Sequence, residues 1–197
     1  MNQLRHAAIN RRTQETDIAL SVELDSDGTS EVLTGIGFFD HMLTHIAKHG
    51  HLGLTVRAAG DLHIDDHHTV EDVGIALGQA LKEAIGDKRG INRYGDALVP
   101  MDEALVSCGF DWSGRGLLVS DIVFSVPKIG TFDTDLVNEF FSAVASNAGI
   151  TLHFEMRRGT NAHHVAECAF KAFGRALKTA KQFDPNSTSI PSTKGTL

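Results

Sequence analysis

The chain carries HHTVEDVGIALGQALK at residues 67–82 and HHVAECAFKAFGRALK at residues 163–178, the same pattern set 96 residues apart. Apolar residues follow the double histidine of each copy at helical spacing, so both segments are predicted to be long helices. Alanine, glycine and leucine positions repeat together with the polar ones. An internal duplication is the economical interpretation of a pattern that recurs at one fixed offset.

The segments before these helices also follow the same order. In the first half, strands at 16–25 and 31–35 form a predicted hairpin, followed by a helix at 38–49, a strand at 54–58 and the helix that starts after Asp65, a candidate N-cap. The second half has predicted strands at 97–112 and 116–124, a helix at 134–149, a strand at 150–156 and a helix at 162–182. With a gap of two residues the earlier helices align as well, which places Glu139 opposite His41.

These elements predict an α/β (α+β) fold made of two similar halves. Each half lays two helices on one face of an antiparallel or mixed sheet. We expect one compact unit with half-repeats at 1–92 and 93–183 and a C-terminal tail at 184–197.

The composition of the chain limits the classes of protein to which it can belong. The chain has 197 residues and a formal net charge of -7, which argues against a broad nucleic-acid surface. Residues 1–12 lack the apolar core of a signal peptide, and no apolar run is long enough for a membrane span, so a cytoplasmic location is expected. Cys108 and Cys168 lie in apolar surroundings without a CxxC partner and are predicted to be packing residues.

Histidine is unevenly distributed. Of the 11 histidines, seven fall between residues 41 and 68: His41, His45, His49, His51, His63, His67 and His68. Neutral imidazole is the commonest metal ligand among side chains, so this density favours a metal site. His51 and His63 have no counterpart in the repeat and are assigned to the surface or to the surroundings of the site.

On a helix, Glu71 lies beside both His67 and His68, whereas the two histidines point about 100° apart. One such helix can therefore serve two different metals. A single pair of adjacent histidines is more often a helix cap, a surface pair or a core pair, but its repetition with the glutamate retained favours metal binding. Imidazole and carboxylate without thiolate suit Mn, Fe, Ni or Zn. His41, His45 and His49 add three more imidazoles on one helix face.

Several long stretches resemble the imidazoleglycerol-phosphate dehydratase family of histidine biosynthesis: FFDHMLTHIAKHG, DLHIDDHHTVEDVGIALGQAL, GINRYGDALVPMDEAL, LHFEMRRGTNAHHVAECAFKAFGRAL and PSTKGTL. The resemblance runs from RRTQETD to the last residue and is to the single-function form, without a fused phosphatase domain. It implies a fold like that of ribosomal protein S5 domain 2. It also implies two Mn²⁺ ions per active site and a homo-oligomer of 24 subunits with sites at subunit contacts.

The resemblance further implies the roles of individual residues. The first metal would take His41, His67, Glu71 and His164, and the second His68, His163, Glu167 and Glu139. Glu139 stands where the compared members have histidine, and His45 stands where many have glutamine near the phosphate. Glu15 is the implied acid/base residue and His49 a second candidate for proton transfer. The implied phosphate-binding residues are Arg93, Arg115, Ser192 and Lys194, together with His45.

The implied reaction removes water from D-erythro-imidazole-glycerol phosphate to give imidazole-acetol phosphate. An imidazolate held between two metal ions could expel the hydroxyl and leave a diazafulvene-like intermediate, after which a base removes the neighbouring proton. Two other hypotheses compete: a different dinuclear-metal enzyme such as a hydrolase, and a non-catalytic metal-storage shell. The two arginines and the Ser-Lys tail favour a small phosphorylated substrate, and hence the dehydratase.

Overall fold

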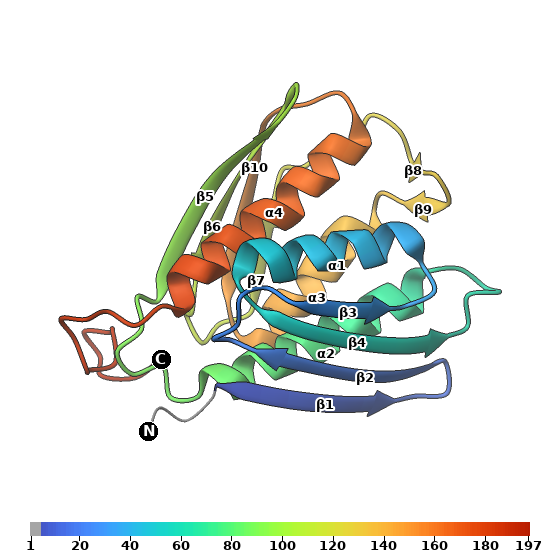
Figure 1. Cartoon of the computed structure of the whole chain (residues 1–197). Coiled ribbons are helices and arrows are strands. Elements are labelled where there is room, and N and C mark those ends of the chain that lie inside the picture. The colour runs from blue at the N-terminus through green and yellow to red at the C-terminus, as the bar shows by residue number, and fades with distance from the viewer. Residues whose placement is uncertain (1–4) are drawn as a thin grey trace.

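A computed structural model of the chain describes residues 5–197. Four helices lie between two four-stranded sheets, one on each side of the molecule (Figure 1). In chain order the elements are β1 (His6–Arg12), β2 (Thr16–Glu23), β3 (Ser30–Leu33), α1 (Gly37–Gly50), β4 (Gly53–Gly60), α2 (His67–Ile85), β5 (Tyr94–Met101), β6 (Ala104–Asp111), β7 (Leu117–Ser120), β8 (Lys128–Ile129), β9 (Phe132–Asp133), α3 (Leu136–Ala148), β10 (Thr151–Arg158) and α4 (Ala162–Lys181).

The two sheets have the same construction. Their strand orders are β1-β2-β4-β3 and β5-β6-β10-β7. In each, the second strand pairs antiparallel with its two neighbours, and the fourth strand of the order pairs parallel with the third. The predicted fold of two similar halves on mixed sheets is therefore confirmed, and the predicted change of half at residue 93 lies between α2 and β5.

The predicted hairpin of residues 16–25 and 31–35 is wrong. β3 pairs in parallel with β4, and β2 pairs with β4 and with β1, a strand that the sequence prediction missed. Alternation identifies β2 as a strand, but it does not say which strand lies beside it. The sequence of β1, HAAINRR, has little apolar character, and the predicted strand at 97–112 is in fact a hairpin of β5 and β6.

The helices of the two halves pack against each other, α1 on α4 and α2 on α3. Repeated glycines allow both contacts to be close. A β-carbon at Gly174 would lie 3.1 Å from the backbone nitrogen of Gly50, and one at Gly78 would lie 2.7 Å from the carbonyl oxygen of Val144. The glycines of the sequence repeat are thus explained by packing, since any larger side chain would push the helix pairs apart.

The core between the sheets contains aromatic residues from three helices. Phe140 of α3 contacts Phe39 of α1 and Phe170 of α4, each at 5.3 Å between ring centroids. Cys108 and Cys168 are both buried and free, as their apolar surroundings predicted. In the part of the chain from residue 5 onward, none of the helices is both long and apolar enough to cross a membrane.

Candidate functional site

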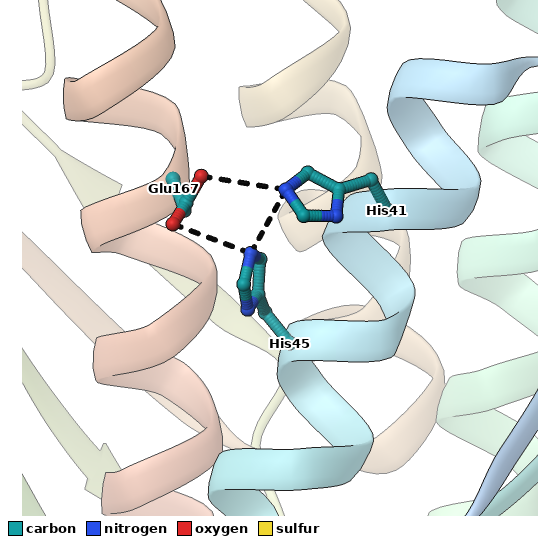
Figure 2. A group of neighbouring side chains, drawn as sticks. All are labelled: His41, His45 and Glu167. Carbon is teal, nitrogen blue, oxygen red and sulfur yellow. Dashed lines mark hydrogen bonds and ion pairs between the residues drawn. The ribbon is translucent and has the colours of Figure 1, made fainter.

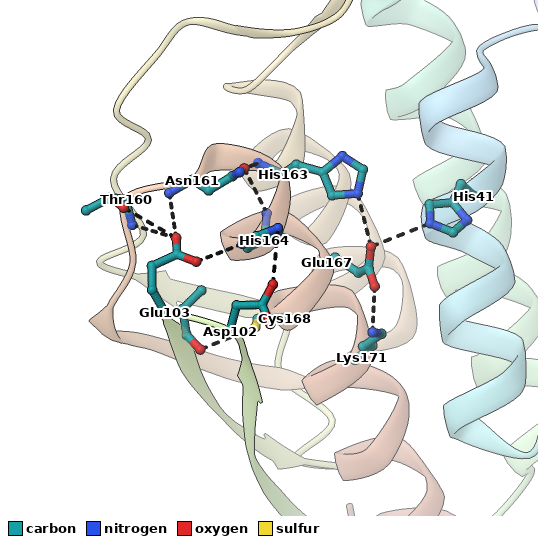
Figure 3. A network of polar contacts seen from close by, with 11 residues as sticks. His41, Asp102, Glu103, Thr160, Asn161, His163, His164, Glu167, Cys168 and Lys171 are labelled. Carbon is teal, nitrogen blue, oxygen red and sulfur yellow. Dashed lines mark hydrogen bonds and ion pairs between the residues drawn. The ribbon is translucent and has the colours of Figure 1, made fainter.

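The first group of predicted ligands lies where α1 faces α4. His41 and His45, one turn apart on α1, point toward Glu167 of α4 (Figure 2). Their Nε2 atoms are 3.2 Å apart, and they lie 3.5 and 3.3 Å from the carboxylate oxygens of Glu167. His163 reaches the same carboxylate at 3.1 Å (Figure 3). A single chain thus gathers three imidazoles around one buried glutamate.

Glu167 is ionised despite its burial. Desolvation raises the pKa of this carboxyl, but the hydrogen bond from Lys171 and the neighbouring His45 outweigh it and lower the pKa to about 2. Burial lowers the pKa of His45 to about 4, so its imidazole is neutral at neutral pH. The carboxylate of Glu167 beside the neutral imidazole of His45 is the protonation state that a metal requires.

The second group lies where α2 faces α3. Nε2 of His67 is 3.7 Å from the carboxylate of Glu71, one turn further along α2. Glu139 of α3 completes a set of three ligand atoms within 4.8 Å of one another. This group mirrors the first, because His67, Glu71 and Glu139 are the repeat partners of His163, Glu167 and His41. Glu139 is therefore placed as a ligand would be.

The adjacent histidines of each helix diverge as predicted. His67 faces Glu71 whereas His68 lies beside Asp61, and His163 faces Glu167 whereas His164 lies beside Glu103. The start of α4 is fixed by Asn161, whose side chain accepts from the backbone N–H groups of both histidines. At α2 the cap residue is Asp66 rather than the predicted Asp65, although the carboxylate of Asp65 accepts the N–H of His67.

His68 and His164, which point away from the two groups, each have a carboxylate at Nδ1. Asp61 lies 3.0 Å from Nδ1 of His68, and Glu103 lies 2.7 Å from Nδ1 of His164 (Figure 3). Hydrogen bonding to these carboxylates raises the pKa of both histidines. Such a bond fixes the tautomer of the ring and directs Nε2 toward a metal. Neither acid was predicted, because they lie 7 and 61 positions from their histidines and outside the repeat.

The two predicted proton-transfer residues lie in different places. The carboxylate of Glu15, in the turn between β1 and β2, is 3.9 Å from Nε2 of His68 and half exposed. His49 lies one turn beyond His45 on the same face of α1, and the ring centroids of the two histidines are 5.8 Å apart. Burial lowers the pKa of His49, and the nearby Lys171 and Arg175 lower it further. Of the two unrepeated histidines, His63 is exposed and His51 contacts Lys178 at 3.2 Å.

The predicted phosphate-binding residues other than His45, which lies beside His41 and Glu167, gather at the other end of α4. The backbone N–H of Arg93 donates to Ala180, and its guanidinium binds Asp111 at 2.7 Å and the carbonyl oxygen of Pro191 at 2.8 Å. Arg93 therefore holds the C-terminal tail, in which Ser192 accepts the backbone N–H of Lys194. The end of the tail lies against the loop that carries Arg115: a β-carbon added at Gly114 would lie only 2.9 Å from the backbone of Leu197.

Comparison with known proteins identifies this arrangement. The family model described as imidazoleglycerol-phosphate dehydratase matches residues 34–177. The imidazoleglycerol-phosphate dehydratase of Jannaschia sp. (strain CCS1) is 59% identical over 195 residues, covering 98% of this chain and 100% of the relative. That of Gluconobacter oxydans (strain 621H) is 60% identical over 198 aligned residues, covering 100% of both.

The chain belongs to the imidazoleglycerol-phosphate dehydratase family. Solved structures of imidazoleglycerol-phosphate dehydratases share its fold. That from Staphylococcus aureus subsp. aureus N315 is 43% identical with a TM-score of 0.83, covering 91% of this chain and 99% of its own. That from Pyrococcus furiosus, in complex with (S)-C348, is 36% identical with a TM-score of 0.83, covering 96% and 100%.

Membership of the imidazoleglycerol-phosphate dehydratase family makes the chain a dehydratase, that is, a hydro-lyase. The resemblance seen in the sequence is thereby confirmed at the level of the family. The implied division of ligands between two metals stays a prediction. Within one chain, the three-ligand groups that we find join His41 to Glu167, and His67 to Glu139, rather than His41 to His67.

Proposed function

We propose that this dehydratase converts D-erythro-imidazole-glycerol phosphate into imidazole-acetol phosphate in histidine biosynthesis, using two Mn²⁺ ions per active site. The observation that carries the proposal is the pair of mirrored ligand groups at the starts of α2 and α4. A substrate ring with two nitrogen atoms suits a site that offers two cations. The cytoplasmic location expected from the sequence belongs to the same proposal.

The donor sets fit such ions. Each group offers three nitrogen or oxygen atoms within 4.8 Å of one another, and neither contains a thiolate. The ligands we propose are the eight predicted residues His41, His67, His68, Glu71, Glu139, His163, His164 and Glu167, with His41 on the same ion as Glu167 and Glu139 on the same ion as His67 and Glu71. When bound, the ions would supply Lewis acidity that favours the anionic form of the substrate imidazole. Asp61 and Glu103 would keep the rings of His68 and His164 in the binding tautomer.

Protein side chains would move the protons. Loss of water breaks a C–O bond at the carbon attached to the ring and a C–H bond at the neighbouring carbon, and the resulting enol becomes the ketone. Glu15, half exposed beside His68, is the proposed base for the C–H proton. His49 is the second candidate, because its lowered pKa leaves it neutral and able to accept a proton.

Arg93, Arg115, Ser192 and Lys194 would bind the phosphate. Arginine forks and a lysine suit phosphate oxygens, and the tail would place its Ser-Lys pair over the anion. Arg93 would do part of this work by anchoring the tail through the carbonyl oxygen of Pro191. The geometry of this end of the molecule supports the set, since the tail passes both arginine loops.

The proposed phosphate set and the ligand groups lie too far apart for one chain to bind one substrate. His164 stands at the start of α4, whereas Arg93 is bound to Ala180 at its end. At about 1.5 Å of rise per residue, the two ends are roughly 25 Å apart. A second chain would have to supply the missing half. This supports sites at subunit contacts in a homo-oligomer, for which we propose 24 subunits.

The test is to load the purified protein with Mn²⁺, add D-erythro-imidazole-glycerol phosphate and follow the acetol product by its absorbance in alkali. Turnover is expected in the wild type and lost in Glu15→Gln, with metal content unchanged. A protein that holds its full metal complement and forms no product would refute the proposal. Light scattering during the metal titration would test whether the particle reaches the mass of 24 chains.

A further inference from the structure

The two mirrored ligand groups differ at two aligned positions, one of which is His45. His45 faces His41 and Glu167 in the group between α1 and α4. The repeat offset that aligns His41 with Glu139 aligns His45 with Ala143, which offers no donor. We propose that His45 is itself a metal ligand, which joins His41 and Glu167 at the ion bound between α1 and α4. The inference rests on the proposed function for the use of metal in this region.

The spacing of the three side chains supports coordination. The two Nε2 atoms lie 3.2 Å apart, that of His41 lies 3.5 Å from one carboxylate oxygen of Glu167, and that of His45 lies 3.3 Å from the other (Figure 2). Ligands bonded to one ion at about 2.0–2.2 Å, with angles between the octahedral and tetrahedral values, lie about 2.8–3.6 Å from one another. The side chains therefore already have the separations that an ion at their centre would require.

The placement of His45 also favours a ligand over a surface histidine. His41 and His45 are four residues apart on one helix face, the arrangement by which a single helix presents two imidazoles to one metal. The side chain of His45 is only 16% exposed, and that of Glu167 only 7%. Both side chains are held by the packing of α1 against α4.

The imidazole of His45 and the exchange of His41 for Glu139 make the two groups chemically unequal. The group of His41, His45 and Glu167 has two nitrogen donors and one carboxylate, whereas the group of His67, Glu71 and Glu139 has one nitrogen donor and two carboxylates. Imidazole suits Co²⁺, Ni²⁺ and Zn²⁺, and carboxylate suits Mn²⁺. The first equivalent of Co²⁺ added to metal-free protein should therefore bind between α1 and α4.

The experiment titrates the metal-free full chain with Co²⁺ and follows heat and the visible spectrum. The variants are His45→Gln, which restores the residue many family members carry there by resemblance, and His153→Gln, an exposed histidine on β10 as the matched control. We expect the dissociation constant of the first equivalent to rise at least about tenfold in His45→Gln, with a changed spectrum, and to stay unchanged in His153→Gln. Equal binding by His45→Gln and wild type would overturn the proposal.

A measurement on the wild type does not depend on the folding of a variant. Diethyl pyrocarbonate modifies neutral imidazoles, and peptide mapping reports the rate at each histidine. One equivalent of Co²⁺ should slow modification of His41 and His45 and leave His153 unaffected. Modification of His45 at the same rate with and without metal would contradict its role as a ligand. Neither readout needs turnover. The role of His45 as a ligand can therefore be refuted while the dehydratase activity is confirmed, and it can be confirmed while the activity is refuted.

Discussion

Glu71 and Glu167 hold equivalent positions in the repeated helix, yet they stand in different environments. The side chain of Glu71 is 41% exposed and faces His67 at 3.7 Å, whereas that of Glu167 is 7% exposed and touches three histidines and Lys171. The duplication has kept the type of ligand, and the neighbours have changed around it. The same sequence motif therefore provides a solvated site in one half and an enclosed, charge-balanced site in the other.

The neighbours of the two glutamates account for this difference. Lys171 follows Glu167 by one turn, and its repeat partner on α2 is Ile75. Two histidines of α1 cover Glu167, whereas the equivalent positions on α3 are Glu139 and Ala143. Burial strengthens the electrostatic interaction at each of these contacts, because charges in a less polar environment are screened less. Matched substitutions in the two halves would measure how far their metal binding and stability differ.

The largest effect is expected from removing the two glutamates in turn. Glu167→Gln should weaken metal binding between α1 and α4 by more than about 100-fold, since a direct ligand matters more than the outer partners whose loss costs about 10–100-fold. It should also destabilise the metal-free protein by about 1–3 kcal/mol, because Lys171 and the histidines lose a buried partner. Urea unfolding and metal titration measure the two effects.

Glu71→Gln is the matched control for this comparison. Its carboxylate is half exposed, so its loss should change the stability of the metal-free protein by less than about 0.5 kcal/mol. It should still reduce metal binding at its own group. Equal destabilisation by the two substitutions would show that the environments of the repeated glutamates do not differ in energy.

The second prediction compares the two halves in substrate binding, because four of the five candidate phosphate residues, all except His45, follow residue 92. The guanidinium of Arg115 is bonded to the backbone oxygen of Ser113 at 3.3 Å and keeps donors for an anion, whereas that of Arg93 binds Asp111 and the tail. Arg115→Ala should raise KM about 10- to 100-fold, the loss of one or two charge-assisted hydrogen bonds.

Metal binding should be unchanged at both groups in Arg115→Ala, because the arginine loop lies at the far end of α4. Arg93→Ala should also raise KM and should in addition make the tail more accessible to limited proteolysis. Loss of metal from Arg115→Ala would show that this residue does not act through the phosphate alone.

The third prediction concerns pH and the carboxylates behind His68 and His164. The hydrogen bond with His164 comes first among the causes that lower the pKa of Glu103 to about 2, followed by the N–H groups of Asn161 and Thr160. The same bond raises the pKa of His164. A metal must displace the proton of His164, so metal loading of the wild type should be complete only above this raised pKa.

Glu103→Gln should let the pKa of His164 fall, and the pH midpoint of metal loading should move down with it. At pH 8, where the ring is neutral in either protein, affinity should drop about tenfold because the ring is no longer oriented. Asp61→Asn should cost less, since its contact with His68 is longer at 3.0 Å. An upward shift of the midpoint in Glu103→Gln would contradict this role.

The hydrogen-bonded pair of Glu103 and His164 also makes the free energy of unfolding depend on pH. Glu103 is charged in the folded chain down to a pKa of about 2, against 4.5 when unfolded, so its stabilisation is full above 4.5 and is lost as the pH falls toward 2. His164 has a raised pKa, so its stabilisation is present below 6.5 and is lost as the pH rises through that raised value. The pair should therefore contribute most between these limits.

The repeat made much of this structure predictable from the sequence. Helix periodicity located α2 and α4 within a residue or two, and the offset of 96 residues aligned the two halves. Pairing of β3 with β4 could not be predicted, because a short exposed strand carries no signal for its partner. The polar strand β1 was missed for the related reason that its sequence lacks a clear apolar alternation.

In the site, too, the arrangement of residues on one helix could be predicted, whereas contacts between different elements could not. Divergence of His67 from His68, and of His163 from His164, follows from helix geometry alone. Contacts between elements were not available from spacing: Asp61 and Glu103 lie outside the repeat, and the approach of His45 to Glu167 depends on how α1 packs against α4. The resemblance implied a place for His45 near the phosphate, and the packing puts its imidazole beside His41 and Glu167.

The smallest effect is expected from exchanging the residues that follow the repeated glutamates. Lys171→Ile removes a cation from Glu167 and gives α4 the residue of α2, and both positions are half-buried. A nearby positive charge opposes metal binding, but Lys171 is 21% exposed and partly screened, so the gain in affinity should be only about two- to fivefold. Ile75→Lys should reduce affinity at the other group by a similar factor. Opposite signs in the two substitutions would show that one charge accounts for part of the difference between the halves, whereas a loss of affinity in Lys171→Ile would show that the lysine holds Glu167 in place for the metal.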